Sequence, residues 1–168
     1  QDSMAYLTVN RGFKSGGVYS GPAPGNTFEP EFLTSFDAGI RNRFLDNTLQ
    51  LNFESFYWKY RDYQFTFINF ASNGTQALVT NNAGKARLYG ANADIILTPT
   101  SADTLSVAVE YLSTKFTDFS YTTPIAVDAQ RSCTSRGIAG SATLANGSSV
   151  PIFRFDCSGV QLARAPKW

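Results

Sequence analysis

The stretch LQLNFE at residues 49–54 alternates strictly between apolar and polar side chains. Successive side chains of a β-strand point to opposite faces, so this alternation predicts a strand with one apolar and one polar face. The pattern continues as far as Tyr60, and FLDNT at residues 44–48 is typical of a tight turn before it. We therefore predict a strand over residues 48–60.

Four further segments alternate in the same way, at residues 5–10, 34–44, 86–97 and 105–116. Most are about twice as long as the roughly 5 to 6 residues common in soluble strands, and they reach the about 9 to 11 residues that a tilted strand needs to cross a bilayer. We expect their apolar positions to share one face. These positions are Ala5, Leu7, Val9, Phe36, Ala38, Ile40, Phe44, Leu49, Leu51, Phe53, Tyr57, Tyr89, Ala91, Ala93, Ile95, Leu97, Leu105, Val107, Val109 and Tyr111.

The connections between these segments alternate between short and long. Residues 44–48 and 98–104 form short links, whereas residues 13–31, 62–84 and 117–165 form long polar ones. This rhythm is typical of transmembrane β-barrels, which have tight periplasmic turns and extended outer loops. We predict an all-β fold that is part of an antiparallel transmembrane barrel, with about five strands and the start of a sixth. Such barrels have at least about 8 strands, so the rest of the barrel is expected from sequence outside this chain.

The opposite face of the predicted strands carries compact polar side chains of both charges. This composition suits a wet lumen, where charges can pair, better than a surface in bulk water. The apolar face stays free of charge, as it must where a Lys or Arg at the bilayer midplane costs about 2 to 4 kcal/mol. We predict that the lumen-facing residues are Asp37, Arg41, Arg43, Gln50, Asn52, Glu54, Asn92, Asp94 and Glu110.

Aromatic side chains gather where the predicted strands approach the long loops. Their position favours a belt at the membrane–water interface. An aromatic core of a soluble fold is the alternative. The residues concerned are Tyr57, Trp58, Tyr60, Tyr63, Phe116 and Phe119.

The composition of the chain argues against several classes of function. The formal net charge is +1, which gives no reason to expect a nucleic-acid partner. The chain contains no His, so it cannot complete a Ser-His-Asp arrangement, and two cysteines alone do not make a zinc site. We therefore expect no catalytic residue, no metal and no cofactor. Cys133 and Cys157 fall in one polar stretch, and an exported loop favours a disulfide between them over two free thiols.

Short motifs in the chain resemble the barrel of TonB-dependent receptors. NRGFKSGG at residues 10–17 is similar to the family's S-R/K-G-F-K/R-S-G-G stretch, and NAGKARLYG at 82–90 is similar to its N-A-G-K-A-x-x-x-G strand. The motifs occur in the family's order over nearly the whole chain, and the ordered set is specific although each motif alone is weak. The other matches are PE at 30–31 with FDAGIR at 36–41, the hairpin from 44 to 64, and RAPKW at 164–168. Asp37 stands where the family usually has Glu, and Asn92 and Asp94 fall where two acids are common.

The resemblance implies an outer-membrane receptor of a Gram-negative bacterium, with a barrel of about 22 strands around an N-terminal plug. In such receptors the TonB complex pulls on the plug to admit a scarce nutrient, most commonly an iron–siderophore complex. Residues 1–168 would belong to the barrel domain, and the plug and its TonB box would lie outside this chain. The partners implied are TonB through that plug, a small-molecule ligand and the lipid bilayer.

Candidate substrate-binding residues lie in the long loops and the upper lumen, where aromatic side chains could stack on a siderophore or sugar. Two other functions remain open from the sequence: a passive porin-like channel and a soluble β-sandwich that binds carbohydrate. A hydrolase is disfavoured, because lumen ion pairing explains the carboxylates more simply. The candidate substrate-binding residues are Lys14, Tyr19, Phe65, Phe67, Phe70, Asn73 and Arg131.

Overall fold

The computed structural model describes residues 2–21, 25–70, 74–82, 84–127, 132–144 and 146–168. In these ranges the regular elements are all β-strands, and no described helix is long and apolar enough to cross a membrane. The strands are β1 (Asp2–Lys14), β2 (Gly17–Val18), β3 (Thr27–Phe28), β4 (Glu31–Phe44), β5 (Leu49–Arg61), β6 (Gln64–Phe70), β7 (Gln76–Asn82), β8 (Gly84–Leu97), β9 (Leu105–Thr123), β10 (Thr134–Thr143) and β11 (Ser149–Asp156).

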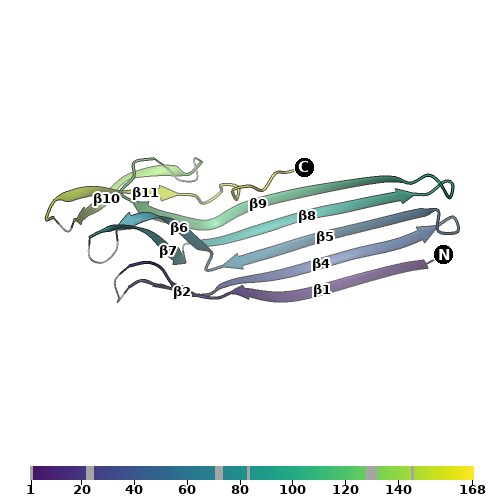
Figure 1. The fold of residues 1–168 in the computed structure, drawn as a ribbon, viewed down its shortest axis with the longest axis horizontal. Helices are drawn as coiled ribbons and strands as arrows, with labels where there is room; N and C mark the ends of the chain where they lie inside the picture. Colours follow the sequence, from purple (N-terminus) through teal and green to yellow (C-terminus); the bar gives the residue numbers. More distant parts are fainter. Residues whose placement is uncertain (1, 22–24, 71–73, 83, 128–131, 145) are drawn as a thin grey trace.

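Five long strands lie side by side and form most of one antiparallel sheet (Figure 1). The order in the sheet is β1-β4-β5-β8-β9-β11-β10, so each long strand pairs with the next long strand along the chain. These five strands confirm the prediction from alternation. All five extend further into the loop region than expected, and the largest extensions are those of β1 to Lys14 and β9 to Thr123.

The register confirms that the apolar positions share one face. Leu51 lies opposite Ile95, and Ile95 lies opposite Val107, so the three side chains form one row across β5, β8 and β9. The apolar face is uncovered: Leu7 is 75% exposed and Val107 is 56% exposed. A soluble β-sandwich would bury these side chains against a second sheet, and no described segment does so.

The tight turn at the short-connection end contains three residues with positive φ, Leu45, Asp46 and Asn47. Asp and Asn tolerate this left-handed conformation better than most residues. The Thr48 amide closes the turn by donating to the carbonyl of Leu45 at 3.1 Å. This turn fixes the pairing of β4 with β5, in which Phe44 lies opposite Leu49.

The long connections contain hairpins that alternation did not predict. β2 pairs with β3, β6 with β7, and β10 with β11. The last of these hairpins joins the main sheet where Phe153 lies opposite Thr123. Figure 1 shows all three at the same end of the long strands, which we call the outer region.

A small aromatic core stabilises the outer region. Phe119 is fully buried, and its ring lies 5.0 Å from the ring of Phe65 and 4.6 Å from that of Phe116. Phe116 and Phe119 reach the same core because the pairing of β8 with β9 shifts between Lys85 and Ala86, which leaves an extra residue in β9. The buried members of this outer core are Phe65, Phe67, Ala86, Phe116, Phe119, Tyr121, Phe155 and Cys157.

The expected aromatic belt is therefore wrong for most of its members. Phe116 and Phe119 belong to the outer core, and the half-buried Tyr60 and Tyr63 pack against it. Tyr57 does lie on the apolar face, directly opposite Tyr89. Trp58 lies on the opposite face, because neighbouring residues of a strand point to opposite sides.

The predicted start of a sixth strand runs beside the free edge of β9 without forming a regular ladder. The Leu112 amide donates to the Lys167 carbonyl at 3.0 Å, and the rings of Tyr111 and Trp168 lie 4.9 Å apart. The C-terminus lies next to β9 in Figure 1. The sheet is therefore open along β1 on one side, and Lys167 and Trp168 lie beside β9 on the other.

Candidate functional site

The polar face of the sheet places the nine predicted lumen residues together. One row crosses the sheet with one residue from each long strand. Its members are Tyr6 of β1, Gly39 of β4, Glu54 of β5, Asn92 of β8 and Glu110 of β9. The neighbouring rows hold the other members on the same face. These members are Asp37, Arg41, Arg43, Gln50, Asn52 and Asp94.

A hydrogen bond spans three strands on this face. The Tyr6 hydroxyl on β1 donates to Glu54 Oε2 on β5 at 2.5 Å, passing over β4. Gly39 lies between them, and a Cβ there would come within 2.5 Å of the Tyr6 ring. The glycine therefore provides the space in which the phenol lies flat across the sheet. The guanidinium of Arg41 covers the same ring, 5.6 Å from its centroid.

Asp37 is a second centre of hydrogen bonding on the polar face. The Trp58 indole Nε1 donates to Asp37 Oδ1 at 2.8 Å. The hydroxyls of Ser35 and Thr8 donate to the other oxygen at 3.0 and 3.2 Å. Three donors from β1, β4 and β5 thus hold this carboxylate in place without a basic partner.

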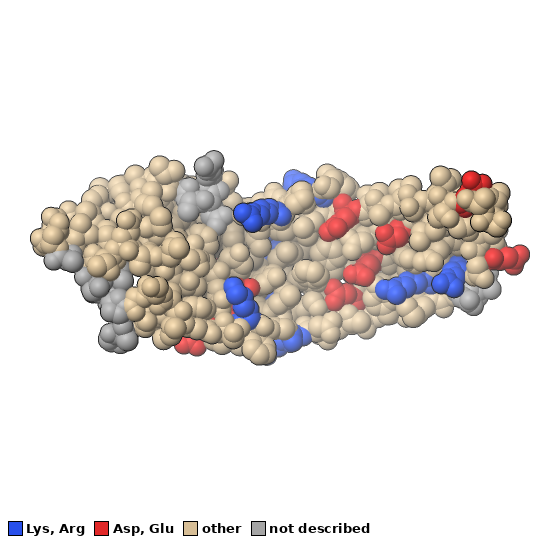
Figure 2. Space-filling view, in the orientation of Figure 1, with Lys and Arg blue, Asp and Glu red and all other residues tan. Residues whose placement is uncertain are grey.

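Most charges of the polar face are not paired with one another. The ion pairs between described side chains are Lys85–Asp118 and Arg136–Asp156, and neither lies on this face. Figure 2 looks onto the polar face and shows acidic side chains over the middle of the sheet, with basic ones on both sides of them, toward the tight turns and toward the outer region. Two amide oxygens, Asn52 Oδ1 and Asn92 Oδ1, are buried without a hydrogen-bond partner. Because these two oxygens are buried, the acceptors open to an incoming donor are the exposed carboxylates of Asp94 and Glu110.

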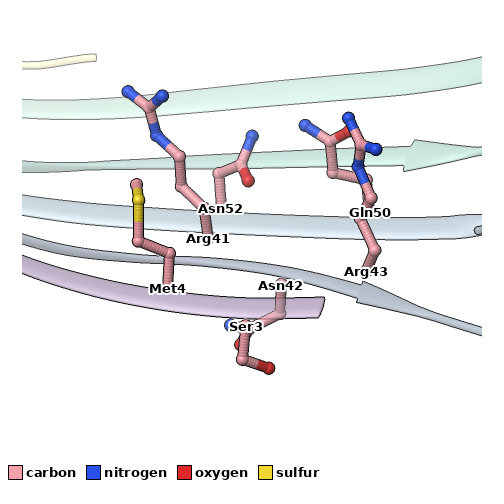
Figure 3. Close-up of a pocket in the computed structure, with 7 residues that line it drawn as sticks. All are labelled: Ser3, Met4, Arg41, Asn42, Arg43, Gln50 and Asn52. Atoms are coloured by element: carbon pink, nitrogen blue, oxygen red, sulfur yellow. The ribbon is translucent and has the colours of Figure 1, made fainter. Parts of the chain in front are cut away.

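A shallow hollow lies at the basic end of this face. Figure 3 shows that Arg41, Arg43, Gln50 and Asn52 project to one side of the sheet, together with Met4. Gln50 and Arg43 are directly opposed in β5 and β4. This arrangement can bind carboxylates or peptide carbonyls through its guanidinium and amide groups.

The predicted substrate-binding residues that the structure describes lie at the end of β1, between β2 and β3, and on β6. Lys14 is exposed at the end of β1, and the Tyr19 hydroxyl donates to the carbonyl of Gly25 at 2.7 Å. Phe70 is half-buried at the end of β6. Asn73 and Arg131 lie outside the described residues.

Phe65 and Phe67 differ from the expectation that they face a ligand. They are 9% and 4% exposed, and their rings stack 5.5 Å apart. Both pack on Tyr121, which holds the β6–β7 hairpin against β9. Their aromatic area stabilises the outer region and is not open to a solute in this conformation.

A polar junction that the sequence did not predict joins two of the long connections. The backbone amide of Gln64 donates to Glu31 Oε2 at 2.8 Å, and the side-chain amide of Gln64 donates through Nε2 to the Ser15 carbonyl at 2.9 Å. Asn82 accepts from the Glu29 amide and donates to the Glu29 carbonyl, both at 2.7 Å. Glu31 and Asn82 both fall in the family-like motifs, which was the available signal, but their partners are more than thirty residues away.

Two links hold the β10–β11 hairpin in the outer region. Cys133 and Cys157 form the predicted disulfide, with a sequence separation of 24. Arg136 donates to Asp156 Oδ2 at 2.7 Å. This charged hydrogen bond, together with those from Ser158, lowers the pKa of Asp156 from 3.8 to about 2. Among the described residues, no cluster of three or more His, Cys, Asp or Glu could hold a metal ion.

Comparison with known proteins gives one match. A family model described as TonB dependent receptor-like, beta-barrel matches residues 1–168. No curated protein and no solved structure matches the chain. The matched range contains all five long strands and all three outer hairpins.

Proposed function

The chain belongs to the TonB-dependent receptor-like β-barrel family, and we propose that it forms part of the wall of a receptor that imports an iron–siderophore complex. The family acts in TonB-dependent transport across the bacterial outer membrane and is one of receptors and transporters, not of enzymes. The observation that carries the proposal is the two-faced register, with an uncovered apolar face opposite a polar one. A strand between lipid and an aqueous lumen needs this arrangement.

The polar face is proposed to meet a plug domain outside this chain. Among the described residues, the carboxylates of Glu54, Glu110 and Asp94 are acceptors that form no ion pair. Basic or amide groups of a plug would satisfy these acceptors, and removal of the plug would return them to water. A passive channel has no such partner, so this surplus of acceptors favours the plugged receptor.

The cargo is proposed from the family's most common task and from the aromatic residues of the outer hairpins. Tyr19 and Phe70 are partly exposed, so they are the aromatic candidates for stacking on an aromatic siderophore. Phe65 and Phe67 support the outer region on which such residues are displayed. A sugar would also stack on these rings, and the transport experiment separates the two cargoes.

Uptake of radiolabelled iron tests the proposal directly. Cells that express the full-length receptor are supplied with a panel of ferric catecholate and hydroxamate siderophores, with and without a functional TonB. The proposal expects accumulation of iron from at least one siderophore, abolished when TonB is absent. Uptake that persists without TonB would indicate a passive channel, and TonB-dependent uptake of an oligosaccharide without any of iron would overturn the cargo.

A further inference from the structure

Basic residues form one continuous row on the outward, apolar face of the sheet. Arg11 lies opposite Thr34, Thr34 opposite Lys59, Lys59 opposite Arg87, and Arg87 opposite Lys115. The row therefore crosses all five long strands and holds a cation on four of them. Since paired strands are about 4.8 Å apart, the last three cations lie on immediately neighbouring strands.

The row marks a sharp boundary on the outward face. Between it and the tight turns, the outward positions of β1, β4, β5, β8 and β9 carry no charged side chain. From Leu97 to Arg87, strand β8 advances about 34 Å at about 3.4 Å per residue, or about 26 Å along the membrane normal for a tilt of about 40°. This height matches the apolar band of about 25 Å in outer-membrane barrels. Tyr57 and Tyr89 lie directly beneath the row, where aromatic residues meet a membrane interface.

A hollow at the level of the row concentrates the positive charge. Lys59, Arg61, Lys85 and Arg87 line it, together with Tyr57 and Thr117. The ammonium of Lys59 lies 5.4 Å from the centre of the Tyr57 ring.

Among the described residues, the carboxylate that forms an ion pair with this patch is that of Asp118, 3.9 Å from Lys85 Nζ. Both side chains are largely exposed, at 60% for Lys85 and 75% for Asp118, so this pair neutralises little of the patch. The other described carboxylates of the long strands lie on the polar face or at the buried junction with Gln64.

We propose that this basic row and its hollow bind the phosphate groups of phosphorylated glycolipids in the outer leaflet. The long connections lie at the same end as the row, so it faces outer-leaflet head groups, and each head group carries its phosphates at the level where the apolar band ends. Unpaired cations on adjacent strands suit a ligand with several negative charges, and arginine can bind phosphate through two parallel hydrogen bonds. The inference rests on the proposed position of the sheet in the outer membrane and not on the cargo.

Binding of lipid A to the purified full-length receptor in neutral detergent tests the proposal. The probes are diphosphorylated lipid A, the same lipid with its phosphates removed, and inorganic phosphate. The double variant Arg87→Gln/Lys115→Gln is compared with Arg41→Gln/Arg43→Gln, which removes the same charge from the opposite face. At about 1 kcal/mol for each basic residue near a charged membrane surface, the outward variant should bind diphosphorylated lipid A about 30-fold more weakly. The lumen variant should bind like the wild type.

Three results would overturn the proposal. The first is an equal loss of lipid A affinity in the two double variants. The second is that the wild type binds lipid A without phosphates as tightly as diphosphorylated lipid A. The third is that inorganic phosphate binds at the row as tightly as lipid A. If the double variant fails to fold, the single variant Lys59→Gln replaces it. This variant should bind diphosphorylated lipid A about 5-fold more weakly than the wild type. Failure of TonB-dependent uptake by the wild type would count against the proposed function alone, because lipid binding is measured without transport.

Discussion

The Tyr6 hydroxyl donates to the Glu54 carboxylate at 2.5 Å across an intervening strand, so β1 and β5 are linked although they do not pair. The link crosses β4 at Gly39, where the absence of a side chain leaves room for the phenol ring. A contact of this kind fixes the positions of three strands relative to one another on the face where the lumen is proposed.

Replacement of the glycine tests this link. Gly39→Ala should displace the Tyr6 ring, break its hydrogen bond to Glu54 and lower the free energy of unfolding by about 1 to 2 kcal/mol. Gly12→Ala is the control, because Gly12 lies on the same face and an added methyl group there meets nothing within 4 Å. Urea unfolding of the full-length receptor, in wild-type and Tyr6→Phe backgrounds, measures both effects. The same loss in both backgrounds would show that the hydrogen bond is not the cause.

The role of Phe65 as a core residue gives a second prediction. Phe65→Ala should destabilise the outer region by about 3 to 5 kcal/mol, since it removes a buried ring that contacts Phe119 and Tyr121. Leu78→Ala, at a position that is 62% exposed on the same hairpin, should have little effect. Hydrogen exchange of amides in β6 and in residues 116–123 measures this. Unchanged exchange combined with weaker ligand binding would instead place Phe65 in the ligand site.

These comparisons show how far the sequence predicts the molecule. Alternation with period two predicted the five long strands and the two faces of their sheet. When one face of a strand is apolar and the other polar, every second residue of the sequence is apolar. Alternation missed the three outer hairpins, which are short or lack strict alternation. It also misplaced Phe119, because one extra residue in β9, after Phe116, moves every later side chain to the other face. Phe116 lies on the polar face that alternation indicates, and it was assigned to the belt only because it is near a long loop.

The sequence predicted which face the residues of the candidate site occupy, but not the contacts between them. Alternation alone places Glu54 and Glu110 on the polar face. It cannot show that Tyr6 reaches Glu54 over Gly39, because that contact depends on the pairing of β1 with β4 and of β4 with β5. The sequence could not predict the hydrogen bond between Gln64 and Glu31 either, since it joins two separate connections.

The disulfide should stabilise the outer region and leave the long strands unaffected. Cys133→Ser/Cys157→Ser opens a loop with a sequence separation of 24, which corresponds to about 3 kcal/mol in the chain-entropy model. Limited proteolysis should then cut residues 134–156 faster while residues 49–61 stay protected. Wild-type protein treated with alkylating agent alone is the control. Equal protection of the hairpin in the variant would contradict the prediction.

The Arg136–Asp156 pair predicts a response to acid. The folded pKa of Asp156, about 2, is lower than its ordinary value of 3.8, so the stabilisation is fully present above about pH 4 and is lost as pH falls toward 2. Asp156→Asn should remove this dependence, and hydrogen exchange of the β10–β11 hairpin between about pH 5 and pH 2 measures it. An identical acid response in the wild type and the variant would assign the effect to another group.

We expect one face of this sheet to contact hydrocarbon and the other to contact water, and the collision accessibility of spin labels distinguishes these two environments. Single labels at positions 107, 108, 109 and 110 are placed in the full-length receptor in a bilayer, with the native disulfide kept oxidised. Oxygen should dominate relaxation of the labels at positions 107 and 109, whereas a water-soluble nickel chelate should dominate at positions 108 and 110. Uniform accessibility along the four positions, or the reverse alternation, would contradict this expectation.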